Sequence, residues 1–207
     1  MNEKTSEKTA PAAPERQPGA YRPQLALYHP NGKGTGGAAK FELHPAHDDT
    51  EGSVMLRIAN QSAIGGQAGG VQQFARFDWE NAITVKLGFA DLCAFLQVFN
   101  GECESLGDGR GLYHRTARAA TKILLRHLVD PRPCYSLELY RTAAGGGEAK
   151  AHMLMSCAEA EGLRAAILGS MSVVCFGIPV VIPRDTSAYR AENSRRAPAT
   201  GPQGAAW

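Results

Sequence analysis

The segment ITVKLGFADLCAFLQVF, residues 83–99, changes its hydrophobic period from two to 3.6 with almost no linker. Its first residues alternate between apolar and polar side chains, which is typical of a strand with one buried face. Its later residues place large apolar side chains three and four positions apart, the spacing of an amphipathic helix, and Asn100-Gly101 supplies a stop signal. The segment predicts a strand that leads directly into a helix lying on its sheet.

The same change of period recurs in the second half of the chain. Residues 151–156 alternate, and a helical stripe then runs to a stop at Gly177. The stripe consists of Leu163, Ala166, Ile167, Met171 and Val174. Ser156 with Glu159 forms a capping box at the start of this helix. A repeated unit of one sheet and one helix favours a binding platform over a reaction chamber.

Short alternating stretches precede both helices. In the first half we expect strands over residues 24–29, 38–44 and 53–60, and a fourth announced by residues 76–79. The glycine-rich turn NGKGTGG joins the first two, and the sequence QSAIGGQAGG predicts a flexible loop before the fourth. In the second half we expect strands over residues 112–116, 117–129, 135–141 and 151–156.

Residues 117–129 also fit a helix by propensity, since their apolar side chains recur at helical spacing. The duplication and the Asp130-Pro131-Arg132-Pro133 stop favour a strand instead. The predicted fold class is therefore α+β, a duplicated ββββα in which two four-stranded antiparallel sheets are each followed by one helix.

Length and composition indicate one folded domain between two polar ends. Of the 207 residues, we expect 21–183 to fold, with 1–20 as a disordered N-terminal arm and 184–207 as a disordered basic C-terminal tail. The net charge is only +2, so bulk charge alone does not identify a polyanionic partner.

The cysteines and the hydropathy pattern bear on location. Five cysteines are an odd number with no C-x-x-C pair, which indicates reduced thiols of an intracellular protein. No stretch approaches the length of a membrane span, and the N-terminal residues have neither secretory nor transit character. We therefore expect a cytoplasmic protein, soluble or nucleoid-associated, with no membrane segment.

Three places in the sequence carry a resemblance to a known family. They are Phe77-Asp78-Trp79 directly before the strand-to-helix unit, the stretch GAAKFELHP at residues 37–45, and residues 152–170. The first is similar to the aromatic-Asp-Trp motif of the Whirly family of single-stranded nucleic-acid-binding proteins, which is related to kinetoplastid mitochondrial RNA-binding proteins. The second is similar to the family's lysine-glycine-lysine-alanine-alanine strand, although the second lysine falls at Gly36 or Gly37. The third resembles the family's last strand and final helix.

The resemblance covers roughly residues 22–178. It implies a Whirly-like fold, a homotetramer built on paired helices, and sequence-tolerant binding of single strands between blades. We expect both helices to bury apolar side chains, including Phe95 and Ile167, against other protomers.

Two turns have alternative interpretations. The turn Gly32–Gly37 matches G-x-G-x-x-G, but a dinucleotide site needs a helix after this motif and a strand is expected here, so a hairpin turn is favoured. A second turn gathers potential metal ligands: His44, His47, Asp48, Asp49 and Glu51. Such residues can hold a divalent ion, but a solvated turn is favoured. The sequence has no catalytic, cofactor or zinc motif, so we expect no enzyme activity, no cofactor and no metal.

A basic stretch between residues 108 and 132 carries the functional prediction. If residues 120–129 form a strand, Lys122 and Arg126 share one face while Ile123 and Leu125 turn to the other. A basic strand face is usually only solvated. Here aromatic side chains interleave with the cations, and bases stack on such rings while cations contact phosphates.

The same alternation turns further side chains away from the core and predicts that several strands offer contacts on one sheet face. We expect Trp79, by contrast, to be a core anchor. The candidate nucleic-acid-binding residues are Tyr28, Lys33, Lys40, Arg57, Lys86, Arg115, Lys122, Arg126 and Tyr140.

The favoured function is sequence-tolerant binding of single-stranded DNA or RNA by stacking and phosphate neutralisation. The alternative is an oligomeric scaffold of the same fold that does not bind nucleic acid, which the near-neutral charge and the missing lysine support. Salt separates the two, because a nucleic-acid binder loses affinity steeply as salt rises.

Overall fold

The computed structural model describes residues 24–178 apart from Asp48 and Pro133. The strands of its first half are β1 (Gln24–His29), β2 (Gly37–His44), β3 (Ser53–Ala63), β4 (Gly66–Ala68), β5 (Val71–Gln73), β6 (Arg76–Phe77) and β7 (Ile83–Leu87). Helix α1 (Phe89–Phe99) follows β7. The second half contains a 3-10 turn (Leu106–Gly109), β8 (Leu112–Arg115), β9 (Ala119–Leu128), β10 (Cys134–Ala143), β11 (Glu148–Ser156) and α2 (Cys157–Phe176). The predicted arms, residues 1–20 and 184–207, lie outside the described residues.

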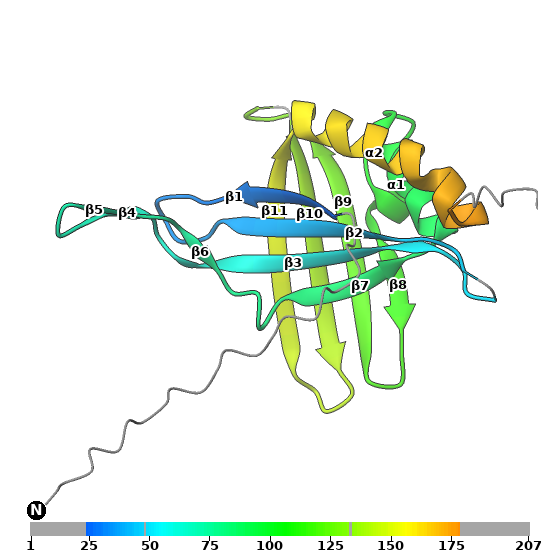
Figure 1. Ribbon diagram of the computed structural model, residues 1–207, viewed down its shortest axis with the longest axis horizontal. Coiled ribbons are helices and arrows are strands. Elements are labelled where there is room, and N and C mark those ends of the chain that lie inside the picture. The colour runs from blue at the N-terminus through cyan, green and yellow to red at the C-terminus, as the bar shows by residue number, and fades with distance from the viewer. Residues whose placement is uncertain (1–23, 48, 133, 179–207) are drawn as a thin grey trace, which may run out of the picture. The chain divides into compact units, whose positions relative to one another are not determined.

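The two sheets confirm the predicted α+β class with a sheet before each helix. In the first sheet β1, β2, β3 and β7 are antiparallel neighbours in that order, and the short β6 also pairs with the end of β3. In the second sheet the order is β11, β10, β9, β8, again antiparallel. Figure 1 shows the strands of the first sheet crossing in front of those of the second at a steep angle.

The ambiguous stretch 117–129 is extended, as the duplication predicts. Strand β9 lies between β8 and β10 and pairs with both. Its side chains alternate in burial, with Ile123 and Leu125 fully buried and Arg126 exposed. Pairing on both edges and burial of one face therefore outweigh the helical spacing of its apolar residues.

The prediction of a flexible loop over QSAIGGQAGG is wrong. Strand β3 continues to Ala63, and β4 and β5 then form a two-stranded ribbon. The ribbon turns at Gly69 and Gly70, both with positive φ, which glycine adopts without steric cost. It projects away from the sheets (Figure 1).

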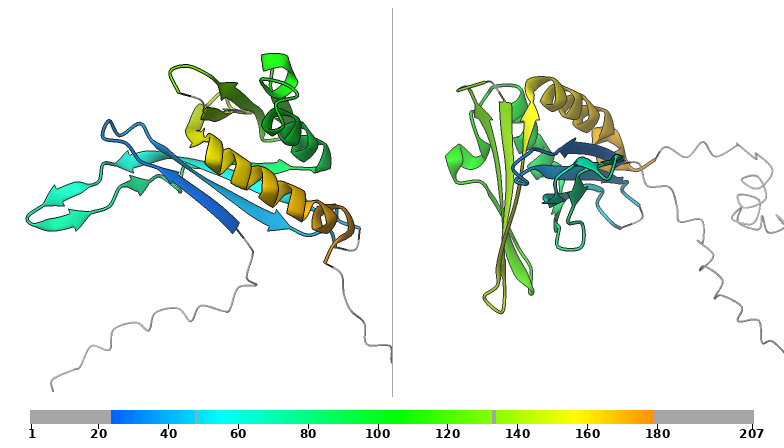
Figure 2. Two further views of the ribbon diagram at one scale, coloured as in Figure 1. Left: turned by 90° about the horizontal axis from the view of Figure 1, so that it is seen from above. Right: turned by 90° about the vertical axis from the view of Figure 1, so that its left-hand side faces the viewer.

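Both sheets turn one face inward to a single hydrophobic core. The inner face of the first sheet contributes Phe41, Leu56, Ile58 and Val85, and that of the second contributes Ile123, Leu137, Leu139 and Met153. Strand β11 crosses the inner face of β2 and β3 closely, and Asn60 donates to the Lys150 carbonyl at 2.8 Å. The opposite faces of the two sheets therefore point away from one another (Figure 2).

The helices close the core from one side. Phe95 on α1 and Ile167 on α2 belong to the protomer's own core, with 0% and 3% of their surface exposed. The expectation that these two side chains are buried against other protomers is therefore wrong. The helical spacing correctly identified one buried face, but it could not distinguish a core inside the protomer from an interface.

The first turn of each helix contains a carboxylate that also pairs with a histidine from the other half of the chain. Asp91 on α1 accepts a hydrogen bond from the Gly88 amide, and its other oxygen lies 3.0 Å from His114 Nε2 on β8. Glu159 on α2 caps Ser156 in the same way, and its other oxygen lies 2.9 Å from His29 Nε2 on β1. The two halves thus exchange one contact at each helix start, where negative charge is favourable.

Candidate nucleic-acid interface

Lysine and tyrosine alternate in register across the outer face of the second sheet. Lys150 on β11 lies opposite Tyr140 on β10, which lies opposite Lys122 on β9, which lies opposite Tyr113 on β8. Lys150 Nζ is 4.8 Å from the centroid of the Tyr140 ring, and Lys122 Nζ is 5.4 Å from that of Tyr113. These four residues, here called the Lys–Tyr row, run perpendicular to the strands.

Glu138 fixes one end of the Lys–Tyr row. Its carboxylate accepts hydrogen bonds from Tyr140 Oη at 2.6 Å and from Ser136 Oγ at 3.2 Å, and it forms an ion pair with Lys150 at 2.9 Å. Burial raises the pKa of Glu138, but hydrogen bonds from Tyr140 and Lys150 and the Lys150 charge outweigh it and hold the pKa at about 2. Hydrogen bonding with Tyr140 and then with Glu138 raises the pKa of Lys150. Tyr140 and Lys150 are therefore held in place before any ligand arrives.

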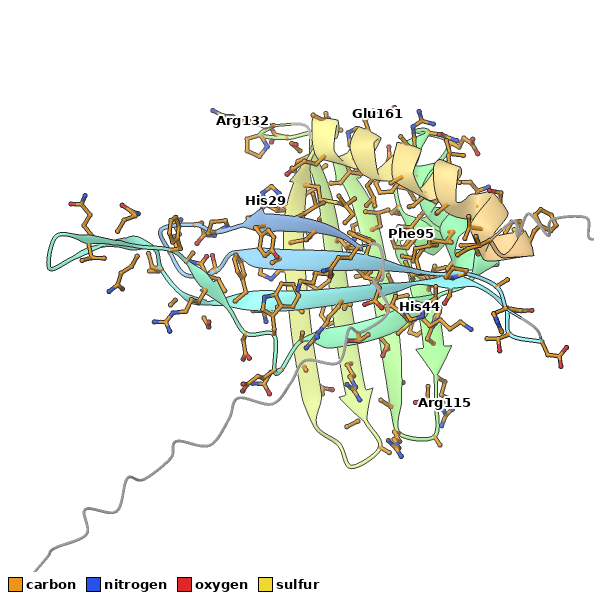
Figure 3. The ribbon with its side chains drawn as sticks, viewed as in Figure 1. His29, His44, Phe95, Arg115, Arg132 and Glu161 are labelled. Carbon is orange, nitrogen blue, oxygen red and sulfur yellow. The ribbon has the colours of Figure 1, made fainter. Side chains whose placement is uncertain are left out.

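The remaining predicted residues of the second half lie on the same outer face. Arg126 lies opposite Ser136, and Arg115 lies opposite Ala120 at the free end of the sheet. Figure 3 shows Arg115 at that free end, whereas Arg132 lies near the helices. Neither Arg115 nor Arg126 forms an ion pair with another described residue.

The outer face of the first sheet has its own aromatic and cationic cluster, centred on Trp79. Lys40 Nζ lies 4.5 Å and the Arg57 guanidinium 5.7 Å from the indole centroid, and Arg57 also donates to the Trp79 carbonyl. Tyr28 lies 6.3 Å from the Trp79 ring and 5.7 Å from the Phe77 ring. We call these five residues the Trp79 cluster.

The expectation that Trp79 is a core anchor is wrong. Its indole is half-buried on the outer face, next to Lys40, Arg57 and Tyr28, and does not belong to the hydrophobic core. The prediction failed because large apolar residues beside a strand are usually, but not always, buried in the core. The turn after Trp79 is held by Asp78, which accepts from the Asn81 amide and side chain, and these hydrogen bonds lower the Asp78 pKa.

Lys40, Arg57 and Lys86 share the outer face of the first sheet, as the alternation predicts, but the full set of candidate residues divides between two sheets. Tyr28, Lys40, Arg57 and Lys86 lie on the first sheet, and Arg115, Lys122, Arg126 and Tyr140 lie on the second. The common core lies between the two sheets, so the two outer faces point in different directions. Lys33 lies on neither face but in the turn between β1 and β2.

That glycine-rich turn is a β-hairpin turn, as expected from the strand after it. Asn31 Oδ1 accepts from the amides of Lys33 and Thr35. Gln61, which is 8% exposed, accepts from the amides of Asn31 and Gly36 and donates to the carbonyls of Asn31 and Ala63. The amides that a phosphate would need are thus engaged by the chain itself.

The histidine and carboxylate turn gives no metal centre within the described residues. His44 Nε2 lies 3.0 Å from Glu42, His47 bridges to Thr50 through the backbone, and Asp48 is not described. No three potential metal ligands gather elsewhere in the described part of the chain. Nor does either helix there have the length and hydropathy needed to span a membrane.

Residue-by-residue reasoning missed Lys150 as a member of these faces. Alternation alone would have placed Lys150 outward, since Ala151 and Met153 beside it point to the core. Its pairing with Tyr140 depends on the register of β10 and β11, which no local pattern determines.

Comparisons with known proteins bear on the fold. No family model and no curated protein matches the sequence. Among solved structures, WHY1 from Arabidopsis thaliana superposes with a TM-score of 0.58 at 12% identity, over 91% of this chain and 100% of that chain. The plant transcriptional regulator PBF-2 gives 0.55 at 18% identity, over 84% and 88% of the two chains. The trypanosome proteins MRP1/MRP2 give 0.50 at 16% identity, over 74% and 86%. WHY1 and PBF-2 are Whirly proteins, and the chain therefore has the Whirly fold.

Proposed function

We propose that the chain binds single-stranded nucleic acid, DNA or RNA, on the outer faces of its two sheets and without catalysis. Bases would stack on aromatic rings while cations neutralise phosphates, so that little sequence is read. The fold similarity to the Whirly structures supports this proposal, but at these identities the argument rests on this chain's own side chains.

The Lys–Tyr row is the observation that carries the proposal. Neighbouring strands are about 4.8 Å apart, so cations and rings alternate at that interval across the sheet. The contact between a lysine and a ring restricts the lysine side chain before a ligand binds. Less side-chain entropy is then lost when the lysine contacts a phosphate and the ring stacks on a base. The Trp79 cluster repeats this combination on the first sheet, with Lys40 and Arg57 against one indole.

The test separates charge from stacking with an oligonucleotide of about 30 nucleotides. Changing Lys122 and Arg126 together to Ala should weaken binding similarly for different sequences. It should also flatten the slope of log affinity against log salt by about one to two units. Tyr140→Ala should instead lower affinity by roughly 1–3 kcal/mol with the salt slope unchanged.

A matched control is the double change of Arg110 and Arg132 to Ala. It removes the same charge, but both residues lie outside the strands. We expect the control to keep the wild-type salt slope within about half a unit, since distant charges are screened at physiological salt. If the wild type shows no salt-dependent binding to any single strand, the proposal fails and the scaffold alternative is favoured.

We further propose that the chain forms a homotetramer through α2. The outward side of α2 exposes Leu168, at 49%, together with Gly162, Ala165 and Gly169. Small residues allow a second helix to approach closely. An open, largely apolar cavity of about 280 Å³ lies beside α2, between Leu25, Phe41 and Ile167. We also propose a cytoplasmic location, as predicted from the odd number of cysteines.

A further inference from the structure

A cavity lies at the free end of the second sheet, next to the end of the Lys–Tyr row. It has a volume of about 420 Å³, within the range of about 300–1,000 Å³ that small-molecule sites occupy. Its lining includes Tyr113, Arg115, Thr142 and several small residues, namely Ala117, Ala119, Ala120, Ala143 and Ala144. We call it the tip cavity.

Two turns build the tip cavity. The β8–β9 turn is closed by Thr116, whose amide and hydroxyl both donate to the Ala119 carbonyl. The hairpin between β10 and β11 is tied to that turn by the Ala144 amide, which donates to the Arg118 carbonyl at 2.9 Å. By strand register, Ala120 and Thr142 face outward with Tyr113 and Arg115, whereas Ala119 and Ala143 pair on the inner face.

Tyr113 offers this cavity a ring that is far more accessible than that of Tyr140. Tyr113 is 67% exposed, and Lys122 Nζ lies 5.4 Å from the centroid of its ring. Tyr140, by contrast, is half-buried, with its hydroxyl bound to Glu138 and Lys150 over its ring. Tyr113 is therefore the more exposed of the two rings, and its hydroxyl, unlike that of Tyr140, is not bound to a carboxylate of the described residues.

Arg115 supplies the charge. It lies on the same outer face as Tyr113, and its side chain forms no hydrogen bond or ion pair with another described residue. Glu148 is the acidic side chain in the same cross-strand row, with Thr142 and Ala120 between it and Arg115. Three strand spacings separate the two, about 14 Å, which exceeds the distance over which salt screens exposed charges.

From this geometry we propose that the tip cavity is a site for one nucleotide of the bound strand. The base stacks on Tyr113 beside Ala120, and its phosphate pairs with Arg115. The class of ligand is a nucleoside monophosphate unit of any base, because the cavity lining has few groups that could read a base edge. This proposal rests on the proposed function but adds a site that the Tyr140 and Lys122 contacts do not require.

Methyl NMR with adenosine monophosphate tests the site directly. Millimolar adenosine monophosphate should shift the methyl signals of Ala120 and Thr142 but not those of the buried Ala151 and Ala160. Tyr113→Ala should abolish these shifts, and Tyr113→Phe should keep them, since stacking needs only the ring. Arg115→Gln should weaken adenosine monophosphate severalfold and leave adenosine unchanged, while inorganic phosphate alone should shift no cavity methyl signal.

A binding assay with the strand of about 30 nucleotides separates this proposal from the proposed function. Tyr113→Ala should lower its affinity by about 5- to 100-fold. If the wild type binds the strand but the nucleotide moves no cavity methyl signal and Tyr113→Ala binds as the wild type does, the tip cavity is not a nucleotide site. If the nucleotide shifts the cavity signals but no strand binds, the tip cavity binds a free nucleotide, and both the strand-binding function and the cavity's part in it fail.

Discussion

Gly37→Ala should destabilise the protein sharply, because no side chain fits where strand β11 crosses β2. A Cβ atom at Gly37 would lie 1.9 Å from the His152 carbonyl oxygen and 3.1 Å from Met153 Cβ. Relief requires β2 and β11 to move apart by at least about 1 Å. Asn60, which pairs with Gly37 in the sheet, makes hydrogen bonds to Lys150 at 2.8 Å and to His152 at 3.3 Å.

That movement would break both hydrogen bonds, at about 1 kcal/mol each, and would loosen the inner packing beside them. We expect a total loss of about 2–4 kcal/mol in the free energy of unfolding. For a domain of this size the melting temperature should fall by about 5–15 °C. Thermal unfolding followed by circular dichroism, at one fixed protein concentration, measures this fall in melting temperature.

Gly32→Ala is the matched control in the same hairpin turn. Its Cβ would meet nothing within 4 Å, and its φ is not positive. We expect a change of less than about 0.5 kcal/mol, or a slight stabilisation. Equal stability of Gly37→Ala and Gly32→Ala would refute the close crossing of the two sheets. The same argument explains why a lysine, which the resemblance would place at Gly36 or Gly37, is absent, since a Cβ at Gly36 would lie 2.2 Å from the His29 carbonyl oxygen.

Three further predictions follow from particular contacts. Leu168→Lys should convert the proposed tetramer to smaller species, which light scattering measures. Because this side chain is half exposed in the protomer, the melting temperature of the protomer should not change. An unchanged molecular mass would exclude the α2 interface. His29→Ala should lower the free energy of unfolding by about 0.5–1 kcal/mol near neutral pH, because a partly exposed ion pair contributes little more. If calorimetry shows no loss of stability, the contact between His29 and Glu159 does not stabilise the fold. Because the Glu138 pKa falls from 4.5 to about 2, its contribution of at most about 3 kcal/mol is present above pH 4.5 and lost as pH falls toward 2. Glu138→Gln should therefore flatten acid unfolding over that interval, and an unaltered profile would contradict the network.

The sequence by itself determined the elements that local patterns specify. The alternation in residues 83–87 and the helical spacing after it depend only on which face of one element is buried, and β7 and α1 follow it closely. The capping box at Ser156 and Glu159 likewise placed the start of α2 correctly. Lys122 and Arg126 could be assigned to an outer face because period-two alternation in β9 leaves no other choice once the strand is accepted.

Only the tertiary structure decided which of these faces meet. Trp79 is predicted from the sequence to be a core residue, yet its indole lies outside the core, against Lys40 and Arg57 of the first sheet. The Lys–Tyr row depends on the registers of three strand pairs, and a shift of one residue in any of them would separate its members. The division of the candidate residues between two outer faces follows from the packing of both inner faces into one core, a contact between segments about 100 residues apart. Local patterns carry no information about such distant pairings, because the free energy that selects them comes from burial between the two sheets.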